Sequence, residues 1–497
     1  MAIAFGDMTP LKKSSLVLFG SVLLIGVLGV ISFDNFQYLS SIPISNTSFT
    51  RSIVLNRSLN LDAYPQASGI DIIKLNGHYY PAYPPGYSFM AVPFYGALQV
   101  FNFVWVRLFD PMTAASSLFL ESLALELPSI LALALLTMLV FRLLVFYKVS
   151  TTVASLTAWS LPFTTFLLGY SASAFFHLPA AALLFLSFYL LVSSLNYPLT
   201  RSLFVGLAMG GVVLTEYVPA ICFIPLGIAF LMRSRSVVKS SVVLAGFVVG
   251  LVVLGLYNNY LFGGPLNFGE NFAATSGNKE AISKGISFSG NPVTSLVGNY
   301  LSITKGLFPN APLAVLGVLG MWFFFKKKRG DFLLALSFLL IVSGVYAFWH
   351  DWGGGWSLGP RFYTSLLPFF FLGAGFFLDQ INRNIWEILI FGALGLFGLF
   401  TAFWSLMMGP RLIVARALEH FGTPAIQRFN RLPTILAEGE KIPTNVAPHL
   451  IQNYKEWPIL TSLPFSWWFT IYSLIILLII MGSLVYLLKL NHDIKRS

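Results

Sequence analysis

Long apolar stretches without a charged side chain constrain this chain more than any other feature. Three of them are Ser14–Phe33, Ile388–Met408 and Trp468–Leu488. A helix of ~20 apolar residues spans the ~30 Å hydrocarbon core of a bilayer, so each stretch can cross a membrane. Of the 497 residues, 56% are hydrophobic and 10% are charged, against roughly 25% charged in an average soluble domain. The sequence therefore predicts a polytopic membrane protein.

Basic residues determine the predicted topology. Clusters such as Lys12/Lys13 and Lys326–Arg329 fall between alternate pairs of apolar helices, and the positive-inside rule assigns them to the cytoplasm. We expect an all-α fold of about 12 transmembrane helices in the plasma membrane, with both termini cytoplasmic. The expected helices cover residues 14–33, 122–147, 151–169, 174–195, 201–215, 217–232, 240–258, 311–325, 331–349, 362–380, 385–408 and 467–489.

The stretch Met90–Phe109 is also apolar, but every later loop would change sides if it crossed the membrane. It is better explained as an extracytoplasmic juxtamembrane helix that lies along the membrane surface or dips into it. The outer side then carries three long segments, at residues 34–121, 259–310 and 409–466. We divide the chain into two transmembrane modules, residues 1–258 and residues 259–497.

Composition argues against several other classes of protein. The formal net charge of +11 is explained by lysine and arginine in cytoplasmic loops, so no nucleic acid partner is expected. Cys222 is the only cysteine, which rules out an intramolecular disulfide. No histidine–carboxylate spacing indicates a bound metal, and the isolated acids form no oxygen cage. The sequence indicates no cofactor, and it leaves a divalent metal open.

Acidic residues are scarce, so their positions are informative. Asp34 follows the first apolar helix directly, and Glu216 interrupts a pair of unusually short helices. Short, broken helices often flank a substrate cavity. His177 begins the fourth expected helix on the outer side. Each of these residues also has a structural explanation, as a helix-terminal or turn residue at the membrane interface.

The segment Phe348–Arg361 contains the densest set of candidate ligand-binding groups. It holds Asp351, three consecutive glycines, and Arg361 at the start of a helix. Glycine lets the backbone approach a ligand closely, and a guanidinium beside helix N-terminal amides suits a phosphate. Lys305 offers a second cation on the same face. An aromatic interfacial loop with a snorkelling arginine would explain the tryptophans, but not the glycine run.

In this order, these pieces resemble the GT-C superfamily of polyprenyl-phosphate-sugar glycosyltransferases. The likeness is greatest to the protein O-mannosyltransferase and aminoarabinose-transferase-like branch. It rests on Asp34, on Asn76–Gly86, which includes His78 and Tyr83, and on Trp352–Phe362. The resemblance covers roughly residues 14–380.

The resemblance implies a membrane glycosyltransferase, transferring a hexose or pentose from a polyprenyl-phosphate donor such as dolichyl phosphate. The acceptor would be a protein, a lipid or a glycan on the extracytoplasmic side. The resemblance also implies that Asp34 is the general base. Many relatives have two adjacent acids at this point, whereas this chain has Asp34 followed by Asn35. A metal requirement is therefore not carried over.

A polyprenyl phosphate leaves as a stable anion, so one base and cations on the departing phosphate would suffice. We expect Asp34 to be the base, Arg361 and Lys305 to hold the phosphate, and the anomeric configuration to be inverted. The expected pocket residues are His177, Glu216, Asp351, Tyr83 and His78. The alternatives are a secondary transporter and a lipid-linked-sugar flippase. A transporter would normally show ionisable groups at helix midpoints and internal repeats.

Overall fold

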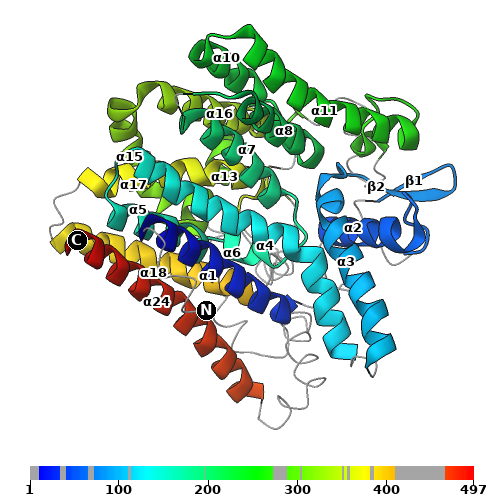
Figure 1. Ribbon diagram of the computed structural model, residues 1–497, viewed down its shortest axis with the longest axis horizontal. Coiled ribbons are helices and arrows are strands. Elements are labelled where there is room, and N and C mark those ends of the chain that lie inside the picture. The colour runs from blue at the N-terminus through cyan, green and yellow to red at the C-terminus, as the bar shows by residue number, and fades with distance from the viewer. Residues whose placement is uncertain are drawn as a thin grey trace.

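Helices make up nearly all the regular structure of the computed structural model (Figure 1). The structure describes residues 10–33, 41–64, 72–109, 114–194, 196–272, 288–302, 305–349, 352–354, 357, 359–380, 385–408 and 465–496. Up to residue 262 the elements are α1 (Pro10–Phe33), α2 (Ser41–Arg51), the π-helix η3 (Ser52–Asn56), β1 (Ile72–Leu75), β2 (His78–Pro81), α3 (Gly86–Leu108), α4 (Ala114–Phe146), α5 (Thr151–Phe163), α6 (Leu167–Ser171), α7 (His177–Val192), α8 (Leu199–Thr215), α9 (Tyr217–Ala220), α10 (Phe223–Ser234) and α11 (Val237–Phe262). The later elements are η5 (Gly269–Phe272), α13 (Pro292–Leu301), α14 (Leu307–Asn310), α15 (Ala314–Lys327), α16 (Arg329–Ala347), η7 (Arg361–Leu366), α17 (Leu367–Gln380), α18 (Ile385–Met408) and α24 (Phe465–Arg496).

The described helices are those of an integral membrane protein, as predicted. Seven of them are long and apolar enough to cross a bilayer, and four shorter apolar helices accompany these among the described residues. The all-α prediction is confirmed, while the count of about 12 spans stays a prediction. The predicted helix 385–408 coincides with α18, and the predicted break after residue 215 separates α8 from α9.

The predicted juxtamembrane segment forms a single helix, α3. It begins at Gly86, ends at Leu108 and packs beside the first part of α4 (Figure 1). Its length and hydropathy also satisfy the criteria for a membrane span. Its orientation along the membrane surface therefore stays a prediction.

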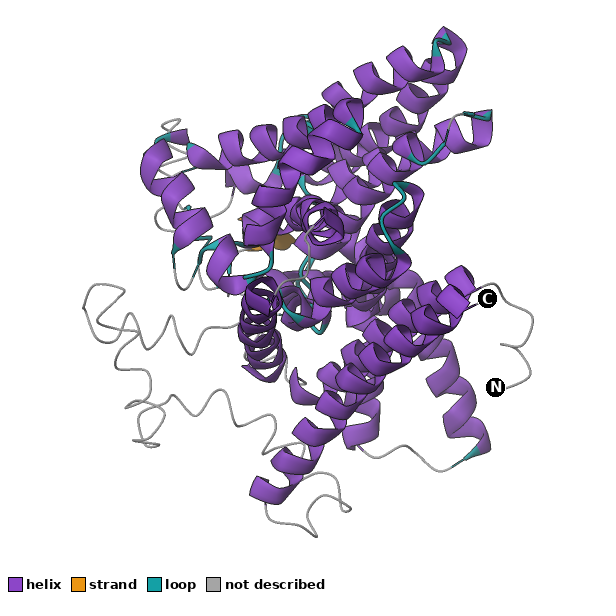
Figure 2. Ribbon diagram, turned by 90° about the vertical axis from the view of Figure 1, so that its left-hand side faces the viewer, coloured by secondary structure: helices purple, strands orange, loops and turns teal. Residues whose placement is uncertain are grey.

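A β-hairpin in the first outer segment was not predicted. Strands β1 and β2 pair antiparallel, with Leu75 opposite His78, and form the only sheet in the described part of the chain (Figure 2). The turn residues Asn76 and Gly77 have φ angles of 51° and 88°. Asn-Gly is the residue pair that favours such left-handed two-residue turns, so the sequence did carry a local signal for this hairpin.

Glycines let neighbouring helices approach closely. Gly206, Gly210, Gly246 and Gly250 line the contact between α8 and α11, where a Cβ atom on Gly250 would lie 2.3 Å from the Gly210 carbonyl oxygen. Helices α15 and α17 meet in the same way. Small residues take this role in membranes because helix association there depends on close van der Waals packing.

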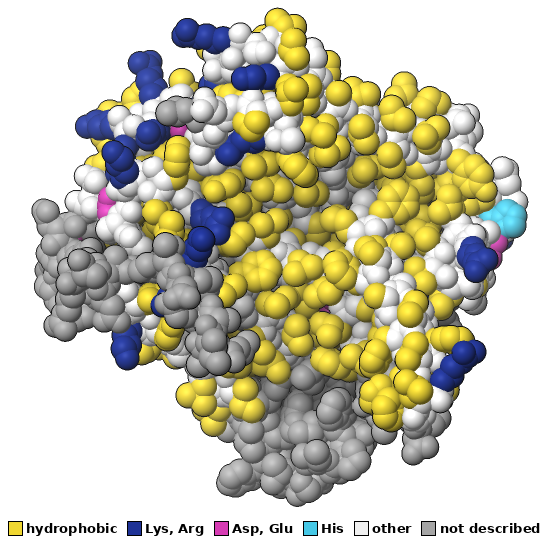
Figure 3. All heavy atoms as spheres, viewed as in Figure 1, with side chains coloured by type: hydrophobic (Ala, Val, Ile, Leu, Met, Phe, Trp, Pro, Cys, Tyr) yellow, Lys and Arg dark blue, Asp and Glu magenta, His cyan; other side chains and the backbone are white. Residues whose placement is uncertain are grey.

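The basic loops predicted to share one side of the membrane lie together. The Lys327 ammonium, at the end of α15, lies 3.8 Å from Asp379 Oδ2 at the end of α17. The same ammonium donates a hydrogen bond to the Lys148 carbonyl. Arg233, in the last turn of α10, pairs with Asp331 in the first turn of α16. Figure 3 shows lysine and arginine side chains gathered toward its upper left, beside a broad hydrophobic surface. We call the region around Lys148, Arg233, Lys327 and Asp331 the basic end.

The α8–α11 contact yields a test of the fold. Gly250→Val should lower stability by about 1–3 kcal/mol, because the added side chain overpacks the contact. Thermal unfolding of the purified protein in detergent, followed by circular dichroism, measures the change. Gly255→Val is the matched control on the same helix, since a Cβ atom there would meet only Pro265 Cβ at 3.5 Å. Equal losses in both variants would contradict the proposed close contact.

Candidate functional site

A buried carboxylate joins three helix ends away from the basic end. Glu216 follows α8, His177 begins α7, and Tyr346 lies in the last turn of α16. The Tyr346 hydroxyl donates to Glu216 Oε1 at 2.8 Å, and His177 Nδ1 lies 3.1 Å from the same oxygen. Glu216 is 5% exposed and His177 is 2% exposed. Neither nitrogen of His177 makes a well-directed hydrogen bond within the described chain, so the ring is held by proximity and packing.

The break between α8 and α9 brings Glu216 into this position. Its backbone is extended, with φ −155° and ψ 128°, between two helical segments. The next helix is only four residues long and contains Pro219. Proline lacks an amide hydrogen and disfavours continuation of a preceding helix. The break in the helix therefore places the Glu216 carboxylate at a buried junction between α8 and α9.

Aromatic rings surround this carboxylate. Tyr346 stacks on Phe362, with ring centroids 4.4 Å apart and an interplanar angle of 16°. The edge of Phe362 meets His177 at 6.1 Å. Tyr83 approaches Phe176 at 5.3 Å, and Phe176 lies 4.3 Å from His177. The structure therefore brings Tyr83, His177 and Glu216 into one connected cluster.

The first outer segment packs directly on the helix break. A Cβ atom on Gly86 would lie 2.4 Å from the Leu214 carbonyl oxygen, so only glycine fits against the end of α8. Asn46 in α2 donates its amide to the Ala174 carbonyl at 2.7 Å. These contacts tie Gly86 to the end of α8, and α2 to the segment just before α7.

Two cations converge on the glycine-rich segment. The Lys305 ammonium donates to the Ser357 carbonyl at 2.5 Å, and the Ser357 hydroxyl donates to the Gly354 carbonyl at 3.3 Å. Gly354 has a φ of 64°, and a Cβ atom there would lie 2.9 Å from Arg361 Nε. Because glycine has no Cβ atom, this position leaves room for the Arg361 side chain. Lys305 and Arg361 approach the same short loop from different elements.

Arg361 also interacts with the carboxylate cluster. Its charge acts electrostatically on the hydroxyls of Tyr346 and Tyr170, and Glu270 acts on Tyr346 as well. The Nε atom of Arg361 is buried and has no hydrogen-bond partner among the described residues. A buried donor without a partner is costly unless a ligand or water satisfies it. This donor is therefore available to an anionic group bound at the loop.

His78 lies outside this cluster, on the β-hairpin. Its Nδ1 atom is 2.5 Å from Asp62 Oδ2, and the Tyr79 amide donates to Asp62 Oδ1 at 2.8 Å. The hydrogen bond with His78, followed by the one from Tyr79, lowers the pKa of Asp62 below its ordinary value. His78 therefore fastens the hairpin through an ionised carboxylate. Its role in a pocket stays a prediction.

The remaining predicted site residues, Asp34 and Asp351, lie outside the described residues. Asp34 follows the last residue of α1, Phe33, and Asp351 lies between Trp349 and Trp352. Their roles as base and pocket residue stay predictions.

Three residues near the site were not singled out in the sequence. Tyr346 and Glu270 interact with the cluster, and Glu126 is a buried carboxylate in α4 that acts on the Tyr87 hydroxyl. Tyr346 sits in an apolar helix and gives no local signal. Glu126 could have been found, because an acid within a helix long and apolar enough to cross a membrane is rare.

The site offers a surface for an anion beside a polar, aromatic-lined cluster. Paired cations can hold a phosphate, and aromatic faces suit a sugar ring. Within the described residues, no group of three or more His, Cys, Asp or Glu side chains is arranged to hold a metal ion.

Comparisons with known proteins give similarities of structure only. No protein-family model and no curated protein sequence matches the chain. The chain is similar to ArnT from Cupriavidus metallidurans bound to undecaprenyl phosphate, with 13% identity, a TM-score of 0.48, and coverage of 96% of this chain and 77% of that one. It is also similar to the Archaeoglobus fulgidus oligosaccharyltransferase in the apo form, with 12% identity, a TM-score of 0.42, and coverage of 83% and 59%.

At TM-scores below 0.5 the similarity carries no functional conclusion. The function is proposed from the residues of this chain.

The hydrogen bond between Tyr346 and Glu216 can be tested directly. Tyr346→Phe should lower stability by about 1–3 kcal/mol, because it takes a donor from a buried carboxylate. Unfolding in detergent measures the loss. Tyr260→Phe is the matched control, since this tyrosine is 75% exposed and should change stability by less than about 0.5 kcal/mol. If the two variants were equally stable, the buried hydrogen bond would not contribute to the fold.

Proposed function

We propose that this protein is a glycosyltransferase that takes a sugar from a polyprenyl-phosphate donor on the extracytoplasmic side of the membrane. One observation carries the proposal: Lys305 and Arg361 meet at a glycine-rich loop next to a buried carboxylate cluster. In a lipid-linked phosphate sugar, the phosphate can bind the two cations and the sugar ring can pack on the aromatic cluster. The polyprenyl chain can lie in the surrounding bilayer.

The departing phosphate explains why two cations are needed. As the bond to the anomeric carbon breaks, negative charge grows on the phosphate oxygens, and positive groups fixed in advance stabilise that charge. Arg361 presents a planar fork of donors, whereas Lys305 is a compact charge on a flexible stem. We assign bidentate phosphate binding to Arg361 and charge neutralisation to Lys305.

The acceptor requires a base, and we assign that role to Asp34. A carboxylate at the outer end of α1 can remove the acceptor proton while the acceptor attacks the anomeric carbon from the side opposite the phosphate. A single displacement of this kind inverts the anomeric configuration. The phosphate leaves as an anion and needs no acid, unlike the leaving group of a glycoside hydrolase.

The proposed topology follows from the basic end. Positive residues collect on the cytoplasmic side of membrane proteins, so we assign the basic end and both termini to the cytoplasm, and the candidate site to the outer side of the plasma membrane. Residues 1–258 and 259–497 remain our proposed modules. A secondary transporter or flippase would also have cations in a membrane cavity, but it would not need Asp34 as a base.

Arg361→Ala tests the phosphate assignment. Removing a group that stabilises developing charge should lower turnover about 100-fold or more, and donor affinity should fall with it. Purified protein in lipid, supplied with a panel of polyprenyl-phosphate sugars, gives both quantities. Arg107→Ala is the control, because this exposed arginine contacts the Phe103 ring on α3. Unchanged affinity and turnover in Arg361→Ala would refute the assignment.

Asp34→Asn tests the base and separates a transferase from a transporter. Sugar transfer should fall about 100- to 10,000-fold, since a general base supplies that range, while donor binding should persist. Equal transfer by wild type and variant would move the base elsewhere. Donor binding without transfer or hydrolysis by either protein, with donor movement across the bilayer, would favour a flippase.

A further inference from the structure

A second polar pocket lies at the basic end, away from the candidate site. Its volume is about 400 Å³, and it is lined by Phe146, Val192, Ser194, Tyr197, Arg233 and the segment Lys328–Asp331. These residues come from the last residues of α4 and α7, the α7–α8 loop, the end of α10, and the junction of α15 with α16. We propose that this pocket binds the phosphate of an anionic phospholipid headgroup from the adjacent leaflet.

Charge is the first argument for an anion. Three cations line the pocket, and Asp331 is the only carboxylate among its lining residues. That carboxylate is already engaged, because Arg233 pairs with one oxygen and the Tyr147 hydroxyl donates to the other at 2.8 Å. Lys328 and Arg329 have no carboxylate partner in the described part of the chain. The pocket therefore carries excess positive charge that an anion can neutralise.

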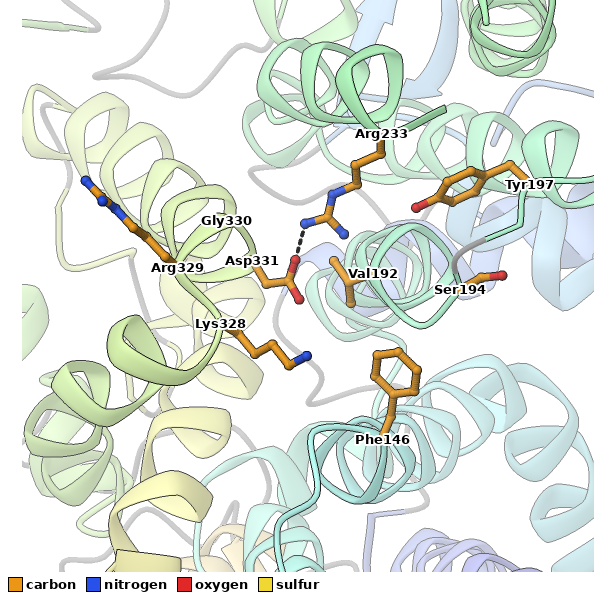
Figure 4. A pocket seen from close by; sticks show the side chains of 9 residues that line it. All are labelled: Phe146, Val192, Ser194, Tyr197, Arg233, Lys328, Arg329, Gly330 and Asp331. Carbon is orange, nitrogen blue, oxygen red and sulfur yellow. Dashed lines mark hydrogen bonds and ion pairs between the residues drawn. The ribbon is translucent and has the colours of Figure 1, made fainter. Parts of the chain in front are cut away.

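The arrangement of side chains is the second argument. Figure 4 shows Lys328 pointing into this space from the left, on the same segment as Asp331, and Arg233 pointing into it from the helix above, with Phe146 below and Tyr197 to the right. Arg329 points away from this space in the same view. Asp331 holds Arg233 in place, so one cation is fixed. The other, Lys328, is an exposed side chain whose ammonium lies 5.8 Å from the centroid of the Tyr147 ring.

An adjoining groove indicates that the anion belongs to a lipid. A second hollow of about 560 Å³ shares Ser194 with the pocket and is lined by Leu186, Leu190 and Phe204 from α7 and α8. Phe204 is 60% exposed, on a helix whose apolar residues suit lipid contact. A phospholipid would place its phosphate among the cations and an acyl chain along this groove. Basic pockets between membrane helices bind anionic headgroups by this combination.

Lipid binding to the intact protein tests the proposal. The purified protein in neutral detergent is titrated with phosphatidylglycerol, phosphatidylcholine and inorganic phosphate, and binding is followed by native mass spectrometry. We expect phosphatidylglycerol to bind in preference to phosphatidylcholine, and inorganic phosphate not to displace it at equal concentration. One basic residue near the headgroup contributes ~1 kcal/mol, so Lys328→Gln should weaken binding about fivefold.

Two further variants complete the test. Lys328→Arg should retain affinity, because it keeps the charge. Lys326→Gln is the matched control, since Lys326 is exposed, lies over the Trp322 ring and does not line the pocket. Equal affinity for phosphatidylcholine, or equal losses in Lys328→Gln and Lys326→Gln, would overturn the proposal. Displacement of the lipid by inorganic phosphate would assign the pocket to the free anion and reject the lipid.

The outcome does not depend on the proposed transferase activity. Lys328 lies at the start of α16, whereas the candidate site uses Tyr346 at its other end. A protein without sugar transfer could still bind the lipid here, and a transferase could fail to bind it.

Discussion

The buried carboxylate of Glu216 is the interaction on which the candidate site depends. Burying a charged group is costly unless it is paired and hydrogen-bonded. Its partners here are the Tyr346 hydroxyl, which donates a hydrogen bond, and the His177 ring, which lies against the carboxylate. Because those partners belong to α16 and α7, one carboxylate holds three helix ends together. The chain leaving α16 then forms the glycine-rich loop and reaches Arg361.

The bilayer explains why polar chemistry is concentrated at the two ends of the same helices. Charged side chains are expensive in hydrocarbon, so a spanning helix carries them near its termini. Helices α7 and α16 each have one end at the candidate site and the other end at the basic pocket. Helix α8, which packs on α7, also makes close glycine contacts with α11. The two proposed anion sites would lie at opposite ends of the same packed helices.

Hydropathy predicted the helices well because membrane insertion depends on local sequence. Helix α18 and the break at Glu216 could both be placed from the residues alone. The β-hairpin was missed because apolar runs dominated the interpretation, although Asn76-Gly77 is a turn signal. The partnership of Tyr346 with Glu216 joins residues 130 positions apart. No local pattern encodes such a contact, and it appears only when the junction of α8 and α9 packs against α16.

The same packing argues against Glu216 as the general base. A general base must come within hydrogen-bonding reach of the acceptor proton, directly or through one water. Glu216 is 5% exposed, and its Oε1 atom accepts a hydrogen bond from Tyr346 and lies 3.1 Å from His177 Nδ1. Its carboxylate is suited to holding the helix ends and orienting the aromatic cluster. Asp34, which follows α1 in the sequence, is the base that we propose instead. With a phosphate as leaving group, one such base is sufficient, and Glu216 can be purely structural without leaving the proposed reaction short of a catalytic group.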